Sequence, residues 1–306
     1  MDDLRLLVSP SPHIRDTDTT EKIMFAVLLA LLPVVAASIY FFRWDAVRVV
    51  LLASGSAVAT EAIFQRLRKR PVTVADGSAL ITGVLLGLSV PPTLPSWMVI
   101  LGSAFAIAIG KQVFGGLGHN PFNPALVGRA FLTASFAKAM TAWTAPIDAV
   151  SAATPLAMGP AVSRIPDLFF GSVAGSLGET SALAILLGGI YLFYRGVIDY
   201  RIPVGILGSV TVFALLAGQD PVFHLLSGSL LFGAVYMATD MVTSPVTKAG
   251  RWIFGIGIGV IIMVIRVWGG FPEGVTYAIL FMNAVTPLLN RWTRPRIYGQ
   301  GVKVSE

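Results

Sequence analysis

The chain has 306 residues, of which 55% are hydrophobic and 12% are charged, and its net charge is +6. Soluble domains carry about 25% charged residues, so this composition indicates a membrane protein with several spans. Cysteine is absent, which excludes disulfides and cysteine-held iron–sulfur clusters, and the three histidines are too scattered to suggest a metal site. The basic residues lie between apolar runs, where membrane topology explains them, so we expect no nucleic-acid partner.

Ten apolar runs approach the length of about 20 residues that a helix needs to cross a bilayer. They cover residues 23–42, 47–65, 74–90, 97–114, 122–140, 181–196, 202–217, 222–240, 252–268 and 273–291. Gly and Pro shorten or interrupt the third, sixth and seventh runs. The predicted organisation is an N-terminal segment (1–22), five spans (23–140), a long loop (141–180), five more spans (181–292) and a tail (293–306).

The distribution of the basic residues along the chain predicts the orientation. Most of them fall on one side if the N-terminus is placed in the cytoplasm, and the densest cluster covers residues 66–70. The positive-inside rule therefore predicts that both termini are cytoplasmic and that the 141–180 loop lies on the outer face. Lys111 and Arg129 are counted here as cytoplasmic cations. Glu61, near the inner end of the second run, is expected to reach toward the basic cluster.

Short strings recur in the same order in the two halves. The pairs are 77–80 (GSAL) with 228–231 (GSLL), 91–93 (PPT) with 245–247 (PVT), and 123–129 (NPALVGR) with 283–288 (NAVTPL). Each half has an odd number of spans, so the second half inserts upside down, as in many transporters. The predicted fold is therefore an all-α polytopic membrane protein with about ten transmembrane helices in two inverted five-helix repeats.

Two further features point to function at membrane depth. Residues 115–124 (GGLGHNPFNP) contain too many helix breakers for a helix. They form either a broken or re-entrant segment that shapes a cofactor pocket, or an ordinary cytoplasmic loop. Asp76 and Asp240 lie at the ends of apolar runs and are candidates for coupling to Na⁺ or H⁺. The alternative is that each carboxylate caps a helix or pairs with a nearby cation.

The string DAVSAATPL at residues 148–156 lies in the long outer loop. Thr154 precedes Pro155, and a residue before proline is driven to extended geometry, which would present its hydroxyl to a modifying enzyme. Asp148 and Ser151 precede it by six and three residues. Taken alone, the string also fits an ordinary loop with a helix-capping hydroxyl.

Several strings together resemble one family. They are SPSPH (9–13), DGSALITG (76–83), PP (91–92), GHNPFNPA (118–125), SAATPL (151–156) and TDMVTSP (239–245). Over residues 5–300 the chain resembles the NqrB/RnfD family of membrane subunits, and its compact length favours the RnfD branch. That family often has Gly before the acceptor segment, where this chain has Ala152 or Ala153, a conservative departure.

The resemblance implies a redox role in a bacterial cytoplasmic membrane. Thr154 would carry FMN through a phosphoester made by a flavin transferase, with Ser151 and Asp148 in the attachment motif. The complex, with A, B, C, E and G type partner subunits, would exchange electrons between ferredoxin and NAD⁺ while moving Na⁺ or H⁺. Relatives also hold a non-covalent riboflavin, which makes it a second candidate cofactor.

Two other interpretations of the chain stay open. The first is a small-solute permease or channel with an inverted-repeat fold, and the second is an inert assembly scaffold. If FMN is attached, its phosphodiester keeps one negative charge, and Lys138 or Arg164 is the suggested partner from proximity in sequence and predicted side.

Overall fold

The computed structural model describes residues 19–146, 153–159, 164–269 and 274–295. Helices account for the regular structure in these ranges, and no β-strand occurs there. The first half of the chain contains α1 (Thr20–Phe42), α2 (Trp44–Leu67), η1 (Val74–Asp76), α3 (Ser78–Leu88), α4 (Ser96–Ile107), the π-helical η2 (Ala108–Gln112), α5 (Pro124–Ser135) and α6 (Ala137–Met140).

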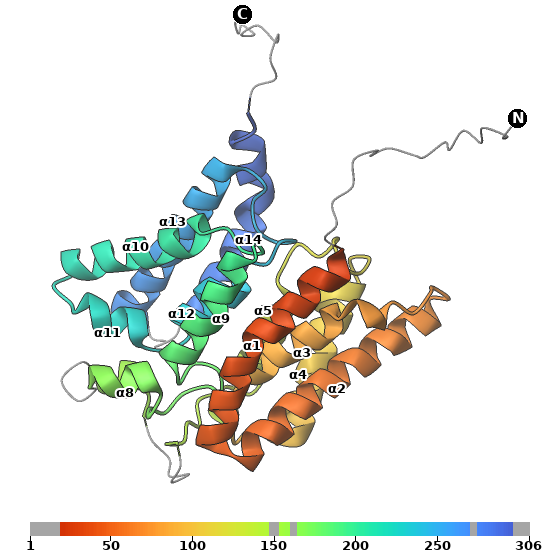
Figure 1. The fold of residues 1–306 in the computed structure, drawn as a ribbon, viewed down its shortest axis with the longest axis horizontal. Coiled ribbons are helices and arrows are strands. Elements are labelled where there is room, and N and C mark those ends of the chain that lie inside the picture. Colours follow the sequence, from red (N-terminus) through yellow and green to blue (C-terminus); the bar gives the residue numbers. More distant parts are fainter. Residues whose placement is uncertain (1–18, 147–152, 160–163, 270–273, 296–306) are drawn as a thin grey trace, which may run out of the picture.

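The rest of the chain supplies the remaining helices. They are α7 (Pro155–Met158), α8 (Ile165–Phe170), α9 (Ala182–Tyr194), α10 (Arg201–Leu216), α11 (Pro221–Leu226), α12 (Leu230–Phe232), the π-helical η3 (Gly233–Met237), α13 (Lys248–Trp268) and α14 (Val275–Trp292). Figure 1 shows two groups of helices side by side, with α1–α5 in red to yellow and α9–α14 in green to blue. The groups meet where α1 packs on α9 and α5 packs on α14.

Local signals set several helix ends. The Thr19 side chain accepts a hydrogen bond from the backbone N–H of Lys22, which caps α1. Asn123 caps α5 in the same way, and Pro124 occupies the first helical position, where its missing N–H costs nothing. Thr247 caps α13 by accepting from the Gly250 N–H. Each cap satisfies an N–H group that would otherwise lack a partner.

Within the described residues, three helices, α1, α2 and α13, are long and apolar enough to cross a membrane. They match the first, second and ninth predicted runs to within a few residues. The eighth run, 222–240, was expected to form one helix, and this expectation is wrong. It divides into α11, α12 and η3, because Ser227 leaves the helical conformation and Gly228 has a φ of +66°.

The third and eighth runs each contain a short helix buried on nearly all sides. In α3, ten of eleven residues are buried, and in α12 and η3 every residue is buried. Each short helix follows a glycine in the left-handed region, Gly77 with φ +76° and Gly228 with φ +66°. The recurring strings at 77–80 and 228–231 thus have the same local geometry, since a left-handed glycine precedes the serine in both.

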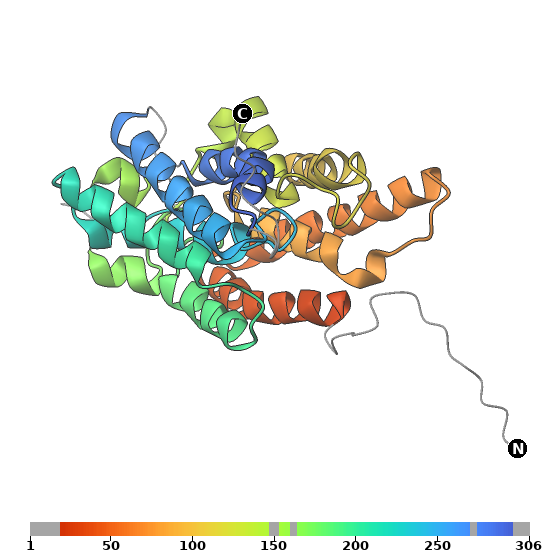
Figure 2. The same ribbon diagram turned by 90° about the horizontal axis from the view of Figure 1, so that it is seen from above.

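Close backbone contact explains some of the glycines inside these helices. A Cβ atom on Gly83 of α3 would lie 2.5 Å from the Ser54 Cα of α2. The helices α10 and α13 lie side by side (Figure 1, Figure 2), and a Cβ on Gly205 of α10 would lie 3.2 Å from the Gly255 Cα of α13. Such contacts allow helix backbones to approach one another directly, as is common in membrane bundles.

Candidate functional site

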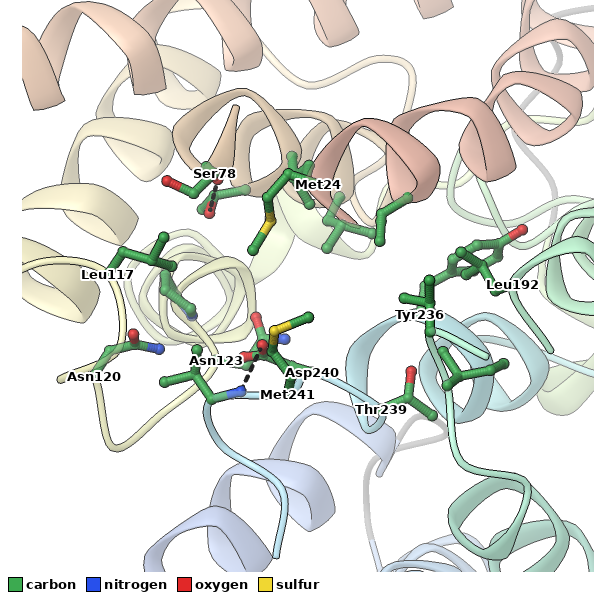
Figure 3. Close-up of a pocket in the computed structure, with 18 of the residues that line it drawn as sticks. Met24, Ser78, Leu117, Asn120, Asn123, Leu192, Tyr236, Thr239, Asp240 and Met241 are labelled. Carbon is green, nitrogen blue, oxygen red and sulfur yellow. Dashed lines mark hydrogen bonds between the residues drawn. The ribbon is translucent and has the colours of Figure 1, made fainter. Parts of the chain in front are cut away.

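A cavity of about 90 Å³ lies where the two groups of helices meet. Its walls come from α1, α3, η2, the start of α5, α9, η3 and the non-helical segments 117–123, 197–198 and 239–242. Its polar lining includes Ser78, Lys111, Asn120, Asn123, Thr239 and Asp240 (Figure 3). A mostly apolar cavity into which a few polar groups converge is the usual setting for a bound cofactor, and buried charges beside it suit a transported ion.

The breaker-rich segment at 115–124 forms one wall of this cavity. Gly115, Gly116 and Gly118 all have positive φ values, which turn the chain back after η2. Asn120 and Asn123 are 5% and 3% exposed, and the Asn123 side chain donates to the Met237 carbonyl at 3.1 Å. The structure therefore favours the pocket-shaping alternative over an ordinary loop, because a loop in water would expose these amides.

The two aspartates predicted at membrane depth have similar local roles. Asp76 Oδ1 accepts from the backbone N–H of Ser78 at 2.8 Å and from its hydroxyl at 2.6 Å, so it caps α3, as the alternative proposed. Asp240 accepts from the Val242 N–H at 3.2 Å and from the Thr243 hydroxyl at 3.1 Å. Asp240 lines the cavity directly, whereas Asp76 reaches it through Ser78.

A buried ion pair, missed in the sequence, stands beside the cavity. Lys111 Nζ lies 2.7 Å from Glu61 Oε1 and 2.9 Å from Oε2, and their side chains are 2% and 1% exposed. The ammonium group also donates to the Ser78 hydroxyl, while the Gln112 and Gln65 amides donate to Glu61 Oε1. The cluster thus joins α2, α3 and η2 through polar groups that largely satisfy one another.

This pair corrects two expectations. Glu61 does not reach toward residues 66–70, and Lys111 is not a cytoplasmic loop cation. The cause is the π-helical turn η2, which inserts an extra residue per turn and places Lys111 on the buried side. The available signal was that two opposite charges lie inside the second and fourth apolar runs, since charges at membrane depth usually pair.

A second buried pair lies between α5 and the segment before α9. Arg129 Nη2 is 3.2 Å from Glu179 Oε1, and their side chains are 5% and 2% exposed. Arg129 was counted among the cytoplasmic cations, and this assignment is wrong because its guanidinium is buried against a carboxylate. Glu179 also lines the small cavity beside Thr154.

Thr154 has the backbone geometry expected before proline, with φ −68° and ψ 155°, and α7 begins at Pro155. Its side chain is not presented to solvent, however. Thr154 is 4% exposed, and its Oγ1 makes no hydrogen bond to any described residue. Ser151 and Asp148 lie outside the described residues, so the motif is seen only from residue 153 onward.

The residues that cover Thr154 come from distant parts of the chain. The cavity beside it, of about 10 Å³, is lined by Glu179, Thr180 and residues 173–175 on one side and by Leu226 and Gly228 on the other. Arg266 anchors the second side, because it donates to the His224 carbonyl at 2.7 Å and to the Ser227 carbonyl at 2.9 Å.

The two cations suggested for a phosphate on Thr154 do not line the cavity beside it. Lys138 lines a separate cleft with Thr93 and Phe136. Arg164 precedes α8, and among the described residues it does not line the cavity beside Thr154. Arg266 lies next to a residue that lines this cavity, because its Nη2 lies 3.5 Å from the position of a Cβ atom on Gly228.

Comparison with known proteins gives consistent matches along the whole chain. The model of the NQR2, RnfD, RnfE family matches residues 7–299. The sequence is 51% identical to the D component of the Na⁺-translocating ferredoxin:NAD⁺ oxidoreductase complex of Acetobacterium woodii, over 98% of this chain and 97% of the relative. It is 42% identical to the D component of the proton-translocating ferredoxin:NAD⁺ oxidoreductase complex of Clostridium ljungdahlii, over 95% and 96%. It is 38% identical to the D component of the ion-translocating oxidoreductase complex of Escherichia coli strain K12, over 95% and 98%.

Proposed function

We propose a function for this chain, which belongs to the NQR2, RnfD, RnfE family: it is the D-type membrane subunit of an ion-translocating ferredoxin:NAD⁺ oxidoreductase. The support is identity of 42–51% along nearly the full length of two relatives with such names. The chain has no cysteine to hold an iron–sulfur cluster. Ferredoxin and nicotinamide therefore react at partner subunits of the A, B, C, E and G types, and this subunit relays electrons within the bilayer.

The proposal includes the full membrane architecture. The chain lies in a bacterial cytoplasmic membrane with ten spans, arranged as five (23–140), an outer loop (141–180) and five inverted spans (181–292). The segments 1–22 and 293–306 are cytoplasmic. The matching left-handed glycines at 77 and 228, each before a short buried helix, support the repeat. The remaining cations outside the runs support the orientation.

Thr154 is the proposed attachment site for FMN, through a phosphoester formed by a flavin transferase. The observation that carries this proposal is that Thr154, inside the SAATPL string, has a buried hydroxyl that makes no hydrogen bond to any of the described residues. A buried polar group normally has a hydrogen-bond partner, so one without a partner needs an explanation. Covalent attachment of a group at this oxygen supplies one. When bound, the flavin supplies one-electron transfer, while the chain sets its position and surroundings.

Access to Thr154 requires a local movement. At 4% exposure the hydroxyl cannot reach a transferase while Leu226 and Gly228 cover it. The 153–158 segment therefore has to leave this cover for modification. Afterwards the attached group holds the segment in a new position, since a phosphodiester does not fit in about 10 Å³.

The central cavity is the proposed site for the non-covalent riboflavin, and at about 90 Å³ it has to widen to admit the ring system. The carboxamides of Asn120 and Asn123 and the hydroxyls of Ser78 and Thr239 supply donors and acceptors for the polar edge of the ring. Leu117, Val235 and Met241 supply apolar contacts. An Asn120→Leu variant is expected to lose the flavin that denaturation releases, while keeping the flavin bound to Thr154.

Ion coupling is proposed at the same cavity. Asp240 lines it directly, and Asp76 connects through Ser78 to the Lys111–Glu61 pair. Relatives are named for Na⁺ in one case and for protons in another, so the ion is a question for measurement. Ferredoxin-driven uptake of ²²Na⁺ into vesicles, with and without a protonophore, distinguishes the two ions. An Asp240→Asn variant is expected to lower uptake per electron transferred.

Flavin fluorescence in a denaturing gel tests the central part of the proposal. Wild type and Thr154→Ala subunits are produced with the transferase, and a fluorescent wild-type band beside a dark variant band is expected. Two dark bands, with the transferase active on another acceptor, would contradict the proposal and favour the permease hypothesis. Unchanged electron transfer in Thr154→Ala would instead favour the scaffold hypothesis.

A further inference from the structure

A second cleft, of about 510 Å³, opens where α9 ends and where α10 and α13 begin. Its walls are residues 196–202, residues 244–246 and the side chain of Arg251. It adjoins the central cavity, because Val197, Ile198, Thr239 and Met241 line both. The redox role proposed above assigns nothing to this cleft.

The charges in the cleft do not balance. Asp199 Oδ2 lies 2.8 Å from Arg201 Nη1 and 2.5 Å from Arg251 Nη1, so two guanidinium groups share one carboxylate. Burial alone would raise the pKa of Asp199, but hydrogen bonds from the Arg201 N–H and from both guanidiniums hold this pKa below its usual value. Asp199 is therefore ionised at neutral pH, and the cluster carries a net charge of one positive unit.

The guanidinium groups have donors left over for a ligand. Arg201 bonds Asp199 through Nη1, and Arg251 uses Nη1 for Asp199 and Nε for the Pro245 carbonyl. A guanidinium has five N–H donors, so both side chains keep donors that these bonds do not use. They are 19% and 31% exposed, so both are open to the cleft. Arginine in this state is well suited to the oxygens of a phosphate group.

Two parallel helices add to the positive potential. Gly205 faces Gly255 and Ser209 faces Gly259, and this constant offset shows that α10 and α13 run in the same direction. Their first residues, Arg201 and Lys248, lie at the same end of the pair. Helix N-termini carry partial positive charge and unpaired N–H groups, which favour anions near them. The partial charge of the helix N-termini adds to the positive potential of the two arginines, but it does not by itself define a binding site.

Aromatic side chains place the cleft at the depth of lipid headgroups. Phe193, Tyr200 and Trp252 form a chain of edge-to-face contacts with ring centroids 6.4 Å apart, and all three are exposed. The Arg201 guanidinium stacks over the Tyr200 ring at 4.7 Å. Neighbouring Tyr194 is 87% exposed. Exposed Tyr and Trp at a helix end are typical of the membrane–water interface.

We propose that this cleft binds the phosphate of an anionic phospholipid. The two arginines would hold the phosphate oxygens, while Ile198, Ile202 and Val246 in the lining would contact the start of the acyl chains. In the orientation proposed above, the lipid belongs to the cytoplasmic leaflet, where basic pockets between helices recognise such headgroups. Free phosphate shares the charge chemistry, but it would gain nothing from the apolar lining or from the aromatic belt.

The expected consequence is local bracing of the central cavity. The lipid would join residues 196–202 to residues 244–246, and these segments flank the shared wall at Ile198 and Thr239. The inference does not depend on the flavin, so protein made without the transferase is suitable for the test.

Native mass spectrometry of the full-length protein in detergent tests the proposal. Phosphatidylglycerol, phosphatidylcholine and inorganic phosphate are titrated separately. We expect phosphatidylglycerol to bind preferentially, and the Arg201→Gln/Arg251→Gln double variant to weaken that binding about thirty-fold, the factor for losing two basic residues near a lipid phosphate. Arg195→Gln is the matched control, because Arg195 is exposed on the same loop but does not line the cleft, and its effect should be at most about twofold.

A variant that is expected to strengthen lipid binding provides a second test in case the double variant does not fold. Asp199→Asn removes the carboxylate and leaves both guanidiniums, so phosphatidylglycerol binding should tighten about five-fold. Equal binding of the two lipids would overturn the proposal, as would unchanged affinity in both Asp199→Asn and the double variant. Binding of inorganic phosphate without a lipid preference would identify a free-phosphate site and would also overturn it.

Discussion

Two buried polar regions of this molecule differ in how completely their groups are paired. Around Glu61, an ammonium and two amides converge on one carboxylate, and Lys111 bonds Ser78 as well. Around Thr154, a hydroxyl equally shielded from solvent makes no hydrogen bond to the described residues. In the first region, the charged and polar groups find their hydrogen-bond partners within the protein. In the second region the described residues leave the Thr154 hydroxyl without a hydrogen bond, and this difference supports the attachment proposal.

The largest expected effect on stability comes from removing one partner of the Glu61–Lys111 ion pair. Lys111→Met leaves the Glu61 carboxylate buried without its cation, which should lower the free energy of unfolding by about 3–5 kcal/mol. Fluorescence-detected thermal unfolding of the detergent-solubilised protein measures this loss. The Glu61→Gln/Lys111→Met double variant removes both charges and should recover most of it. A single variant as stable as the double would show that the ion pair is not formed.

The next prediction compares Gly228, which lines the cavity beside Thr154, with Gly77, the matching left-handed glycine in the first half of the chain. Gly228→Ala and Gly77→Ala both force a side chain into the left-handed region, at about 1–2 kcal/mol each. Only at Gly228 would the new Cβ meet Leu156, 2.8 Å from its Cδ1, whereas at Gly77 the nearest atom is 3.6 Å away.

Gly228→Ala should therefore also displace the Thr154 segment and speed flavin attachment by the purified transferase. Gly77→Ala should leave that rate unchanged, and it serves as the matched control for general destabilisation. Equal attachment rates in the two variants would contradict the idea that Leu226 and Gly228 cover the acceptor.

A smaller effect is expected from the hydroxyl itself. Thr154→Val keeps the shape of the side chain and removes a buried oxygen without a partner, so stability should stay level or rise by up to about 1 kcal/mol. Thermal unfolding of unmodified wild type and variant provides the comparison. A clear loss of stability would show that the hydroxyl has a partner within the chain.

The smallest effect belongs to the partly exposed cluster at Asp199. Its pKa is lowered in the folded state, so it stabilises the fold above the ordinary value of 3.8 and loses this contribution as the pH falls below that value. The contribution should be below about 1 kcal/mol, because the pairs are partly exposed. Unfolding of wild type and Asp199→Asn from pH 7 to pH 3 should show a difference that shrinks in acid. A difference that grows in acid would have the wrong sign.

The sequence predicts well the helices that are long and uninterrupted. The apolar runs at 23–42 and 252–268 become α1 and α13 with small changes at their ends, because caps at Thr19 and Thr247 extend them. The run at 222–240 fails because a short helix buried among protein is as apolar as one that crosses lipid. Gly228, in the left-handed region, is the one residue that marks this run as divided into shorter buried helices, and a single glycine is a weak signal in a sequence.

The sites show the same limit. The string at 151–156 predicts Thr154 as the attachment site, but the cavity beside Thr154 is also lined by Leu226 and Gly228, and no local pattern reports on contacts that distant. The Glu61–Lys111 pair was missed because the topology prediction assigned every basic residue to one side of the membrane and so treated each lysine as exposed. The π-helical turn that buries Lys111 has no recognisable sequence signal.

The mass of one peptide tests the central claim most directly. Trypsin cuts after Lys138 and after Arg164, so the peptide 139–164 contains Thr154 together with Thr141, Thr144, Ser151 and Ser163. The account predicts that this peptide, from protein made with the transferase, gains the mass of FMN less one water, and that fragmentation places the addition on Thr154. An unmodified peptide, or the addition on another of these hydroxyls, would contradict the account.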